Sequence, residues 1–183
     1  MQFLNKLLRR SPKDPYWDRF INGKPSDPLN ETSEAYRTAD AGNVYPVKAE
    51  IPGPPRMAHD LAELAVFMGA TALAVAPTNA AALLAFDGKS DGTGDLPFTL
   101  MIAVPAEADP EKSPGIGGQH ARRVSAMVNH SVASYIRELG YQAIVCPVGV
   151  DPTAAAALAR PTKSFVGDAV LTDLPVALGP QEV

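Results

Sequence analysis

The chain has 183 residues, of which 46% are hydrophobic and 20% charged, and its formal net charge is −4. This length and composition are typical of one soluble globular domain with a core of its own. The sequence has no long basic block, which argues against nucleic acid as a partner, and no apolar stretch reaches the ~18 residues of a transmembrane helix.

The cysteine count restricts the redox chemistry of the chain. Cys146 is the one cysteine, and a single thiol cannot form an internal disulfide or hold a zinc ion or an iron–sulfur cluster. It follows an apolar run and precedes Pro147. We predict a small buried hydrophobe, the alternative being a reactive thiol. No metal site is expected, and because the N-terminus lacks the pattern of a signal peptide, the expected location is the cytoplasm.

Residues 1–55 are predicted to form an extended, proline-rich N-terminal arm. They hold eight of the eighteen prolines, and proline breaks helices and strands. The expected exception is a short amphipathic helix at the start, with an apolar face made by Phe3, Leu4, Leu7 and Leu8.

Aromatic residues in the arm indicate that it packs on something: on its own domain, on a second copy, or on a partner protein. A partly disordered tail and a membrane-surface anchor are the alternatives. We expect another polypeptide to order the arm, with Phe3, Leu7, Trp17 and Phe20 as the partner-binding residues.

Residues 56–183 are predicted to form one compact domain that begins with a helix, a strand, a short helix and a second strand. The first helix, "RMAHDLAELAVFMGA", ends near Gly69 and places five apolar residues on one face: Met57, Leu61, Leu64, Ala65 and Met68. "TALAVAP" is a short buried strand, "NAAALLAFDG" a short helix capped by Asn79, and "LPFTLMIAVP" the second strand.

The second half continues the alternation of helix and strand. The longest helix covers about 119–139 and buries a face that includes Val124, Val128, Val132 and Leu139. A strand near 142–146 follows, then a helix in "DPTAAAALA" and a last strand in "FVGDAVLTDLPV". This order predicts an α/β or α+β sandwich, with helices on both faces of the sheet.

A glycine-rich stretch, "PGIGGQHARR", precedes the longest helix. Free amides at a helix N-terminus favour an anion, which makes Gly117, Gly118 and Arg122 candidate cofactor-binding residues. The alternative is a flexible loop at a helix entry, because the spacing does not match a dinucleotide fingerprint.

Four phrases in the order "MAHDLAELAVFMGATALAVAP", "LMIAVP", "VNHSVASYIRELGYQAIVCP" and "AVLTDLPV" resemble the corrinoid-binding half of reductive dehalogenases. The epoxyqueuosine reductases share a related arrangement. The resemblance runs roughly from Met57 to Val176 and depends most on "LGYQA" and "TDLPV". It implies a nitroreductase-like mixed sheet covered by helices, with cobalamin chemistry, and it adds Thr172 and Asp173 to the cofactor-binding candidates.

The chain also departs from the family pattern. The sequence lacks the segment that helps to enclose the corrinoid, and it has no tyrosine that matches the proton donor. We also expect no cysteine-rich cluster domain. No catalytic residue therefore carries over, and no iron–sulfur cluster is expected, while cobalamin or flavin remains possible. Two hypotheses follow: an accessory or structural subunit of a larger redox enzyme complex, or a corrinoid- or flavin-binding oxidoreductase domain with a separate electron donor. A third reading is that the likeness is accidental.

Overall fold

The computed structural model describes residues 27–39, 42–78, 83–84, 96–106, 116–147, 149–150 and 164–183. Its main sheet has six strands in the order β4-β7-β3-β1-β8, with β6 paired to β3. These strands are β1 (Ala72–Pro77), β3 (Phe98–Pro105), β4 (Ala143–Pro147), β6 (Ser164–Phe165), β7 (Asp168–Thr172) and β8 (Gly179–Gln181). A second sheet pairs β2 (Leu83–Leu84) with β5 (Gly149–Val150).

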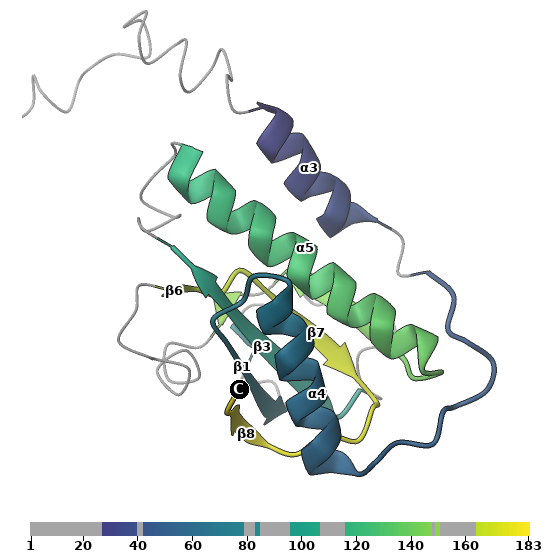
Figure 1. The fold of residues 1–183 in the computed structure, drawn as a ribbon. Helices are drawn as coiled ribbons and strands as arrows, with labels where there is room; N and C mark the ends of the chain where they lie inside the picture. Colours follow the sequence, from purple (N-terminus) through teal and green to yellow (C-terminus); the bar gives the residue numbers. More distant parts are fainter. Residues whose placement is uncertain are drawn as a thin grey trace, which may run out of the picture.

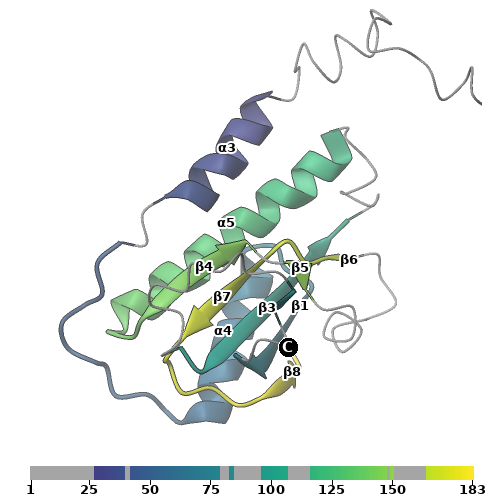
Figure 2. The ribbon, with the colours of Figure 1, turned by 180° about the vertical axis from the view of Figure 1, so that it is seen from behind.

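Within the residues that the structure describes, three helices accompany the sheet: α3 (Asp27–Thr38), α4 (Pro54–Phe67) and α5 (Ile116–Glu138). Helices α4 and α5 lie on one face of the sheet, and α3 runs beside α5 on its outer side (Figure 1). The view from behind shows the strands in front of these helices (Figure 2). The predicted α+β fold is confirmed, although each pairing between described strands is antiparallel, so the sheet is not mixed there. The prediction of helices on both faces is not met within the described residues.

The core lies between the sheet and the helices because strand side chains alternate between the two faces. The strands contribute Leu73, Val75, Leu100, Ile102 and Val170 to the helix-covered face. Helix α4 meets them with Met57, Leu61 and Ala65, and α5 with Val128, Val132 and Ile136. The predicted apolar faces of both helices are confirmed, and Val128 is fully buried.

Two predicted elements differ from the structure, and the reason is tertiary pairing. The prediction of a short helix in "NAAALLAFDG" is wrong at Leu83–Leu84, which pairs as a strand with Gly149–Val150. The strand in "FVGDAVLTDLPV" is not the last, because β8 follows it and pairs with β1. Asn79 and the helix predicted in "DPTAAAALA" lie outside the described residues.

The prediction that the arm lacks regular structure beyond its start is also wrong, because residues 27–38 form α3. Proline is compatible with the first turn of a helix, where its missing N–H needs no partner, and Pro28 lies there. The Tyr36 ring contacts the His130 ring of α5 at 5.6 Å between centroids. Arg37 Nε lies 3.4 Å from Asp168 Oδ1 of β7. These residues therefore pack on their own domain, which was one of the three alternatives.

Candidate functional site

A segment that we call the strap (residues 42–50) crosses the C-terminal end of α5. The N–H of Tyr45 donates to the carbonyl of Arg137 at 2.9 Å, and the N–H of Ala49 donates to the carbonyl of Leu139 at 2.8 Å. Helix C-termini leave carbonyl groups without intrahelical partners. The strap therefore caps α5 through backbone hydrogen bonds, and the Tyr141 hydroxyl adds a 3.3 Å bond to the carbonyl of Ala49.

Gly140 allows the strap to approach this closely. Its φ is +82°, in the left-handed region that commonly closes a helix. A Cβ atom at this position would lie 2.8 Å from the carbonyl carbon of Val47 and 2.8 Å from the Cα of Lys48. Both the backbone conformation and the space favour glycine here.

The two phrases that carry the family resemblance meet at this end of the molecule. Strands β4 and β7 pair so that Ala143 lies opposite Thr172. The N–H of Gln142 donates to Asp173 Oδ1 at 2.6 Å, and the Thr172 hydroxyl donates to the carbonyl of Gln142 at 2.7 Å. The same hydroxyl accepts the N–H of Leu174 at 3.0 Å. "LGYQA" and "TDLPV" thus form one hydrogen-bonded corner.

Lys48 connects the strap to this corner by charge. Its Nζ lies 2.9 Å from Asp173 Oδ2 and 4.5 Å from the centroid of the Tyr141 ring. A cation over an aromatic face is attracted by the ring quadrupole. Asp173 thus holds the turn with one carboxylate oxygen and the strap with the other.

Arg137 fills the space beneath the strap. Its Nη1 donates to the carbonyl of Ala143 at 2.9 Å and its Nη2 to the Ser134 hydroxyl at 2.9 Å. The side chain is buried, and this desolvation lowers the pKa of Arg137. A cation in the last turn of a helix is favoured by the helix dipole. Arg137 thus ties α5 to the first residue of β4.

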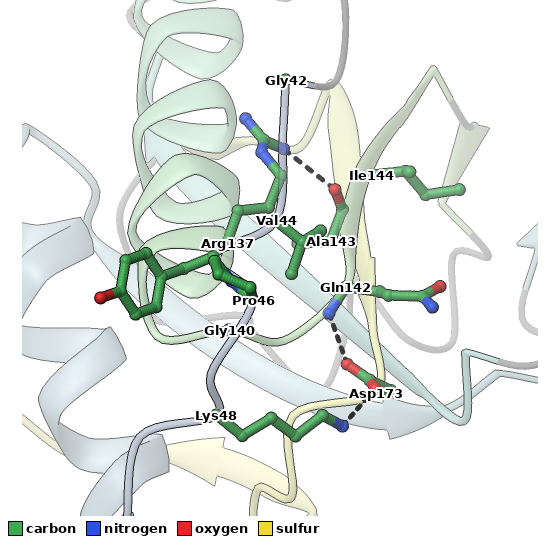
Figure 3. Close-up of a pocket in the computed structure, with 11 residues that line it drawn as sticks. Gly42, Val44, Pro46, Lys48, Arg137, Gly140, Gln142, Ala143, Ile144 and Asp173 are labelled. Atoms are coloured by element: carbon green, nitrogen blue, oxygen red, sulfur yellow. Dashed lines mark hydrogen bonds and ion pairs between the residues drawn. The ribbon is translucent and has the colours of Figure 1, made fainter.

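A groove of about 460 Å³ lies between the strap and β4 (Figure 3). The strap forms one wall, and the start of β4 forms the other. Its lining residues are Gly42, Val44, Tyr45, Pro46, Lys48, Arg137, Gly140, Gln142, Ala143, Ile144 and Asp173.

The structure does not bring the five cofactor-binding candidates into one site. Thr172 and Asp173 belong to the corner just described, with Asp173 lining the groove. Gly117, Gly118 and Arg122 lie near the other end of α5, roughly 30 Å away at 1.5 Å per residue. Gly117 and Gly118 are also inside the helix, because α5 begins at Ile116.

The sequence reasoning missed Lys48, Arg137 and Gln142 as members of this site. The available signal was Gly140, which predicts the end of a helix. It does not indicate which segment of the chain lies against that end. The partner-binding candidates Phe3, Leu7, Trp17 and Phe20 lie outside the described residues and stay a prediction.

Cys146 is buried in β4, as predicted. Burial raises the pKa of its thiol to about 11, and the negative charge of Asp168 adds to the shift. The thiol is therefore protonated at neutral pH, which argues against a nucleophilic role.

Within the described part of the chain, no group of three or more His, Cys, Asp or Glu side chains has the geometry to hold a metal ion. In that same part, no helix has the length and apolar character to cross a membrane.

No protein-family profile matches the sequence, and no curated protein matches it either. Among solved structures, the fold is similar to that of the catabolic reductive dehalogenase NpRdhA, with a TM-score of 0.65 and 20% sequence identity. The match covers 85% of this chain and 25% of NpRdhA, and the same values describe NpRdhA in complex with 3-bromo-4-hydroxybenzoic acid.

A further reductive dehalogenase structure, described with a mechanism for B12-dependent dehalogenation, matches with a TM-score of 0.64 and 20% identity. That match covers 84% of this chain and 25% of the dehalogenase. The chain thus has the fold of a part of reductive dehalogenases and spans about a quarter of their length.

Proposed function

We propose that this protein is an accessory or structural subunit of a larger redox enzyme complex, built on a shortened reductive-dehalogenase-like domain. The observation that carries this proposal is that the polar groups of the corner already have hydrogen-bond and ion-pair partners within the chain. Thr172, Asp173 and the backbone of Gln142 bond to one another, to the turn and to the strap. Polar groups with good intramolecular partners gain little from a cofactor, so the corner favours a structural role.

The chemistry of the thiol supports the same proposal. Electron transfer through iron–sulfur clusters requires several cysteine ligands, and this chain has one cysteine. Cys146 is buried and protonated at neutral pH. Any iron–sulfur cluster that supplies electrons to this domain would therefore need its ligands from outside this sequence.

The second candidate function is a corrinoid- or flavin-binding oxidoreductase domain that works with a separate electron donor. Its support is the likeness of the fold to dehalogenases, one of which is described as acting by B12-dependent dehalogenation. Gly117, Gly118 and Arg122 at the start of α5 stay the candidates for holding an anionic part of such a group.

One experiment separates the two functions. The complete chain is isolated from its own source through a tag, and its absorption spectrum and native mass are recorded. The accessory function predicts extra polypeptide at a fixed ratio and no visible absorption that follows this chain after the complex is dissociated. Bands of corrinoid or flavin that stay with the dissociated chain would establish the second candidate instead.

A further inference from the structure

Arg137 is a buried cation without a carboxylate partner among the residues that the structure describes. The residue is 6% exposed. Its two hydrogen bonds go to the carbonyl of Ala143 and the hydroxyl of Ser134, and both acceptors are uncharged. Glu138, the next residue, is exposed and is not among the residues that line the groove. Buried charges in proteins are normally paired, because removing an ion from water is costly.

The C-terminal end of α5 compensates the charge of Arg137 only in part. The carbonyl groups at the end of a helix are equivalent to about half a negative charge. Two of them, those of Arg137 and Leu139, already accept N–H groups of the strap at 2.9 and 2.8 Å. The guanidinium therefore keeps a net positive charge that a ligand can meet.

Donor groups of Arg137 remain on the side of Gly42. A guanidinium has five N–H groups, and the two hydrogen bonds use two of them. A Cβ atom on Gly42 would lie 3.6 Å from Nε and 3.9 Å from Nη2, so the missing side chain leaves this edge of the guanidinium uncovered (Figure 3). The N–H of Ala143 points to the same side of β4 as its carbonyl and adds a donor. Arg137, Gly42 and Ala143 all line the groove.

The charges of the groove favour one kind of anion. Its described lining includes two cations, Lys48 and Arg137, and one carboxylate, that of Asp173, which pairs with Lys48 at 2.9 Å. The balance is one positive charge, which suits a carboxylate better than a phosphate of about −1.5 to −2. The planar guanidinium also matches the two oxygens of a carboxylate.

We propose that the groove binds a small monocarboxylate with an apolar body, whose two oxygens accept from Arg137 Nε and Nη2. The apolar body would lie between Val44 and Pro46 of the strap and Ile144 of β4. The volume of about 460 Å³ is within the range of small-molecule sites, about 300–1,000 Å³. This site goes beyond both candidate functions and depends on neither.

The test titrates the complete chain with hexanoate. Hexanamide has the same shape without the charge, and inorganic phosphate is the anion control. Hexanoate should bind at least about tenfold more tightly than either, because hydrogen bonds between ionised groups are the stronger ones. In NMR spectra, hexanoate should shift the signals of the Arg137 Nε–H and the Ala143 N–H. The amide of Leu100, in the middle of the sheet, should not shift.

Variants of the strap connect this binding to the groove without altering Arg137. Val44→Glu brings a carboxylate of the chain itself to the groove wall, at a residue that is 38% exposed, and should weaken hexanoate binding by about tenfold or more. Val44→Gln adds the same bulk without the charge and should weaken it by less than about threefold. Val47→Glu is the matched control, because Val47 is 65% exposed and is not among the lining residues. It should leave binding unchanged.

The remaining outcomes overturn the proposal. Absence of hexanoate binding, equal affinity for hexanoate and hexanamide, or full affinity in Val44→Glu disproves the carboxylate site. Tighter binding of phosphate disproves the choice of a monocarboxylate, and shifts that spare Arg137 place the ligand elsewhere. Asp40, two residues before Gly42, lies outside the described residues. Binding that appears only in Asp40→Asn would assign Arg137 to a carboxylate of its own chain.

Discussion

Gly140 shows how one residue can determine where a distant segment lies. Its left-handed backbone closes α5, and its missing side chain leaves room for the backbone of Val47 and Lys48. The strap and the turn at Gly140 are about ninety residues apart in the chain, yet they touch through main-chain atoms. Main-chain atoms are the same in every sequence. No pattern of residue types at the strap could have indicated this contact.

Replacing Gly140 with alanine should therefore be costly. The left-handed conformation alone costs about 1–2 kcal/mol for a residue with a Cβ, and the overlap with the strap should raise the loss in unfolding free energy above about 3 kcal/mol. Gly179→Ala is the matched control, because its φ is +106° with nothing within 4 Å of the added atom. Urea unfolding of both variants checks this, and equal losses would show that the strap does not press on Gly140.

Cys146 should give the folded protein a distinctive alkaline pH dependence. Its pKa is raised from 9.0 to about 11 in the folded state, so the unfolded chain loses the proton first. The contribution of the protonated thiol to the unfolding free energy is fully present below pH 9 and is lost as pH rises to about 11. It amounts to about 2–3 kcal/mol. Urea unfolding at pH 7.5 and 10.5 measures this contribution. The unfolding free energy of Cys146→Ala should fall less between the two pH values than that of the parent chain.

At the scale of elements, α5 organises the core because its apolar residues recur at helical spacing. Val128, Val132 and Ile136 are fully buried against the sheet. Val128→Asp buries a charge without a partner and should lower the unfolding free energy by on the order of 3–5 kcal/mol. Val66→Asp, at a side chain of α4 that is 36% exposed, should lower it by less than about 1 kcal/mol. Similar losses of unfolding free energy in the two variants, measured by urea unfolding, would contradict the burial of Val128 against the sheet.

Helix α3 is attached through a buried carboxyl group at the start of β7. Burial raises the pKa of Asp168, while the Arg37 guanidinium 3.4 Å away lowers it, and burial has the larger effect. The folded state thus favours the protonated carboxyl, and the charged form opposes folding at neutral pH.

Asp168→Asn should therefore raise the unfolding free energy at pH 7. The gain should disappear as pH falls below 3.8, the ordinary value, because the parent carboxyl is then protonated in both states. Arg37→Gln should act in the opposite direction at pH 7, since it removes the cation that offsets burial. Urea unfolding between pH 3 and pH 7 tests the pair. A loss of stability in Asp168→Asn at pH 7 would mean that the ion pair outweighs the burial of Asp168.

At the scale of the whole molecule, the strap makes part of the arm a component of the domain. A chain that starts at residue 51 loses the bonds from Tyr45 and Ala49 to α5 and the pair between Lys48 and Asp173. A chain that starts at residue 42 keeps them. Because a hydrogen bond contributes about 0.5–1.5 kcal/mol, the shorter chain should be less stable than the longer one by about 2–4 kcal/mol. Urea unfolding compares the two, and equal stability would make the strap a passive segment.

The sequence by itself determined the helices and strands whose periodicity is strong. The apolar faces of α4 and α5, the strands β1, β3, β4 and β7, the burial of Cys146 and the α+β class were all predicted from local patterns. They could be predicted because the spacing of apolar residues along the chain indicates which face of a helix or strand is buried.

Tertiary structure alone decided which elements meet. The sequence "DPLNETSEAYRT" is mostly polar, and it becomes helix α3 while packed on α5 and β7. The Leu83–Leu84 pair and the three residues of β8 are strands because a partner strand lies beside them. The corner joins Gln142 to Asp173, and the groove needs the strap as its second wall. Backbone pairing and main-chain contact over long separations leave no periodic signal, so the candidate site appears only when the chain is folded.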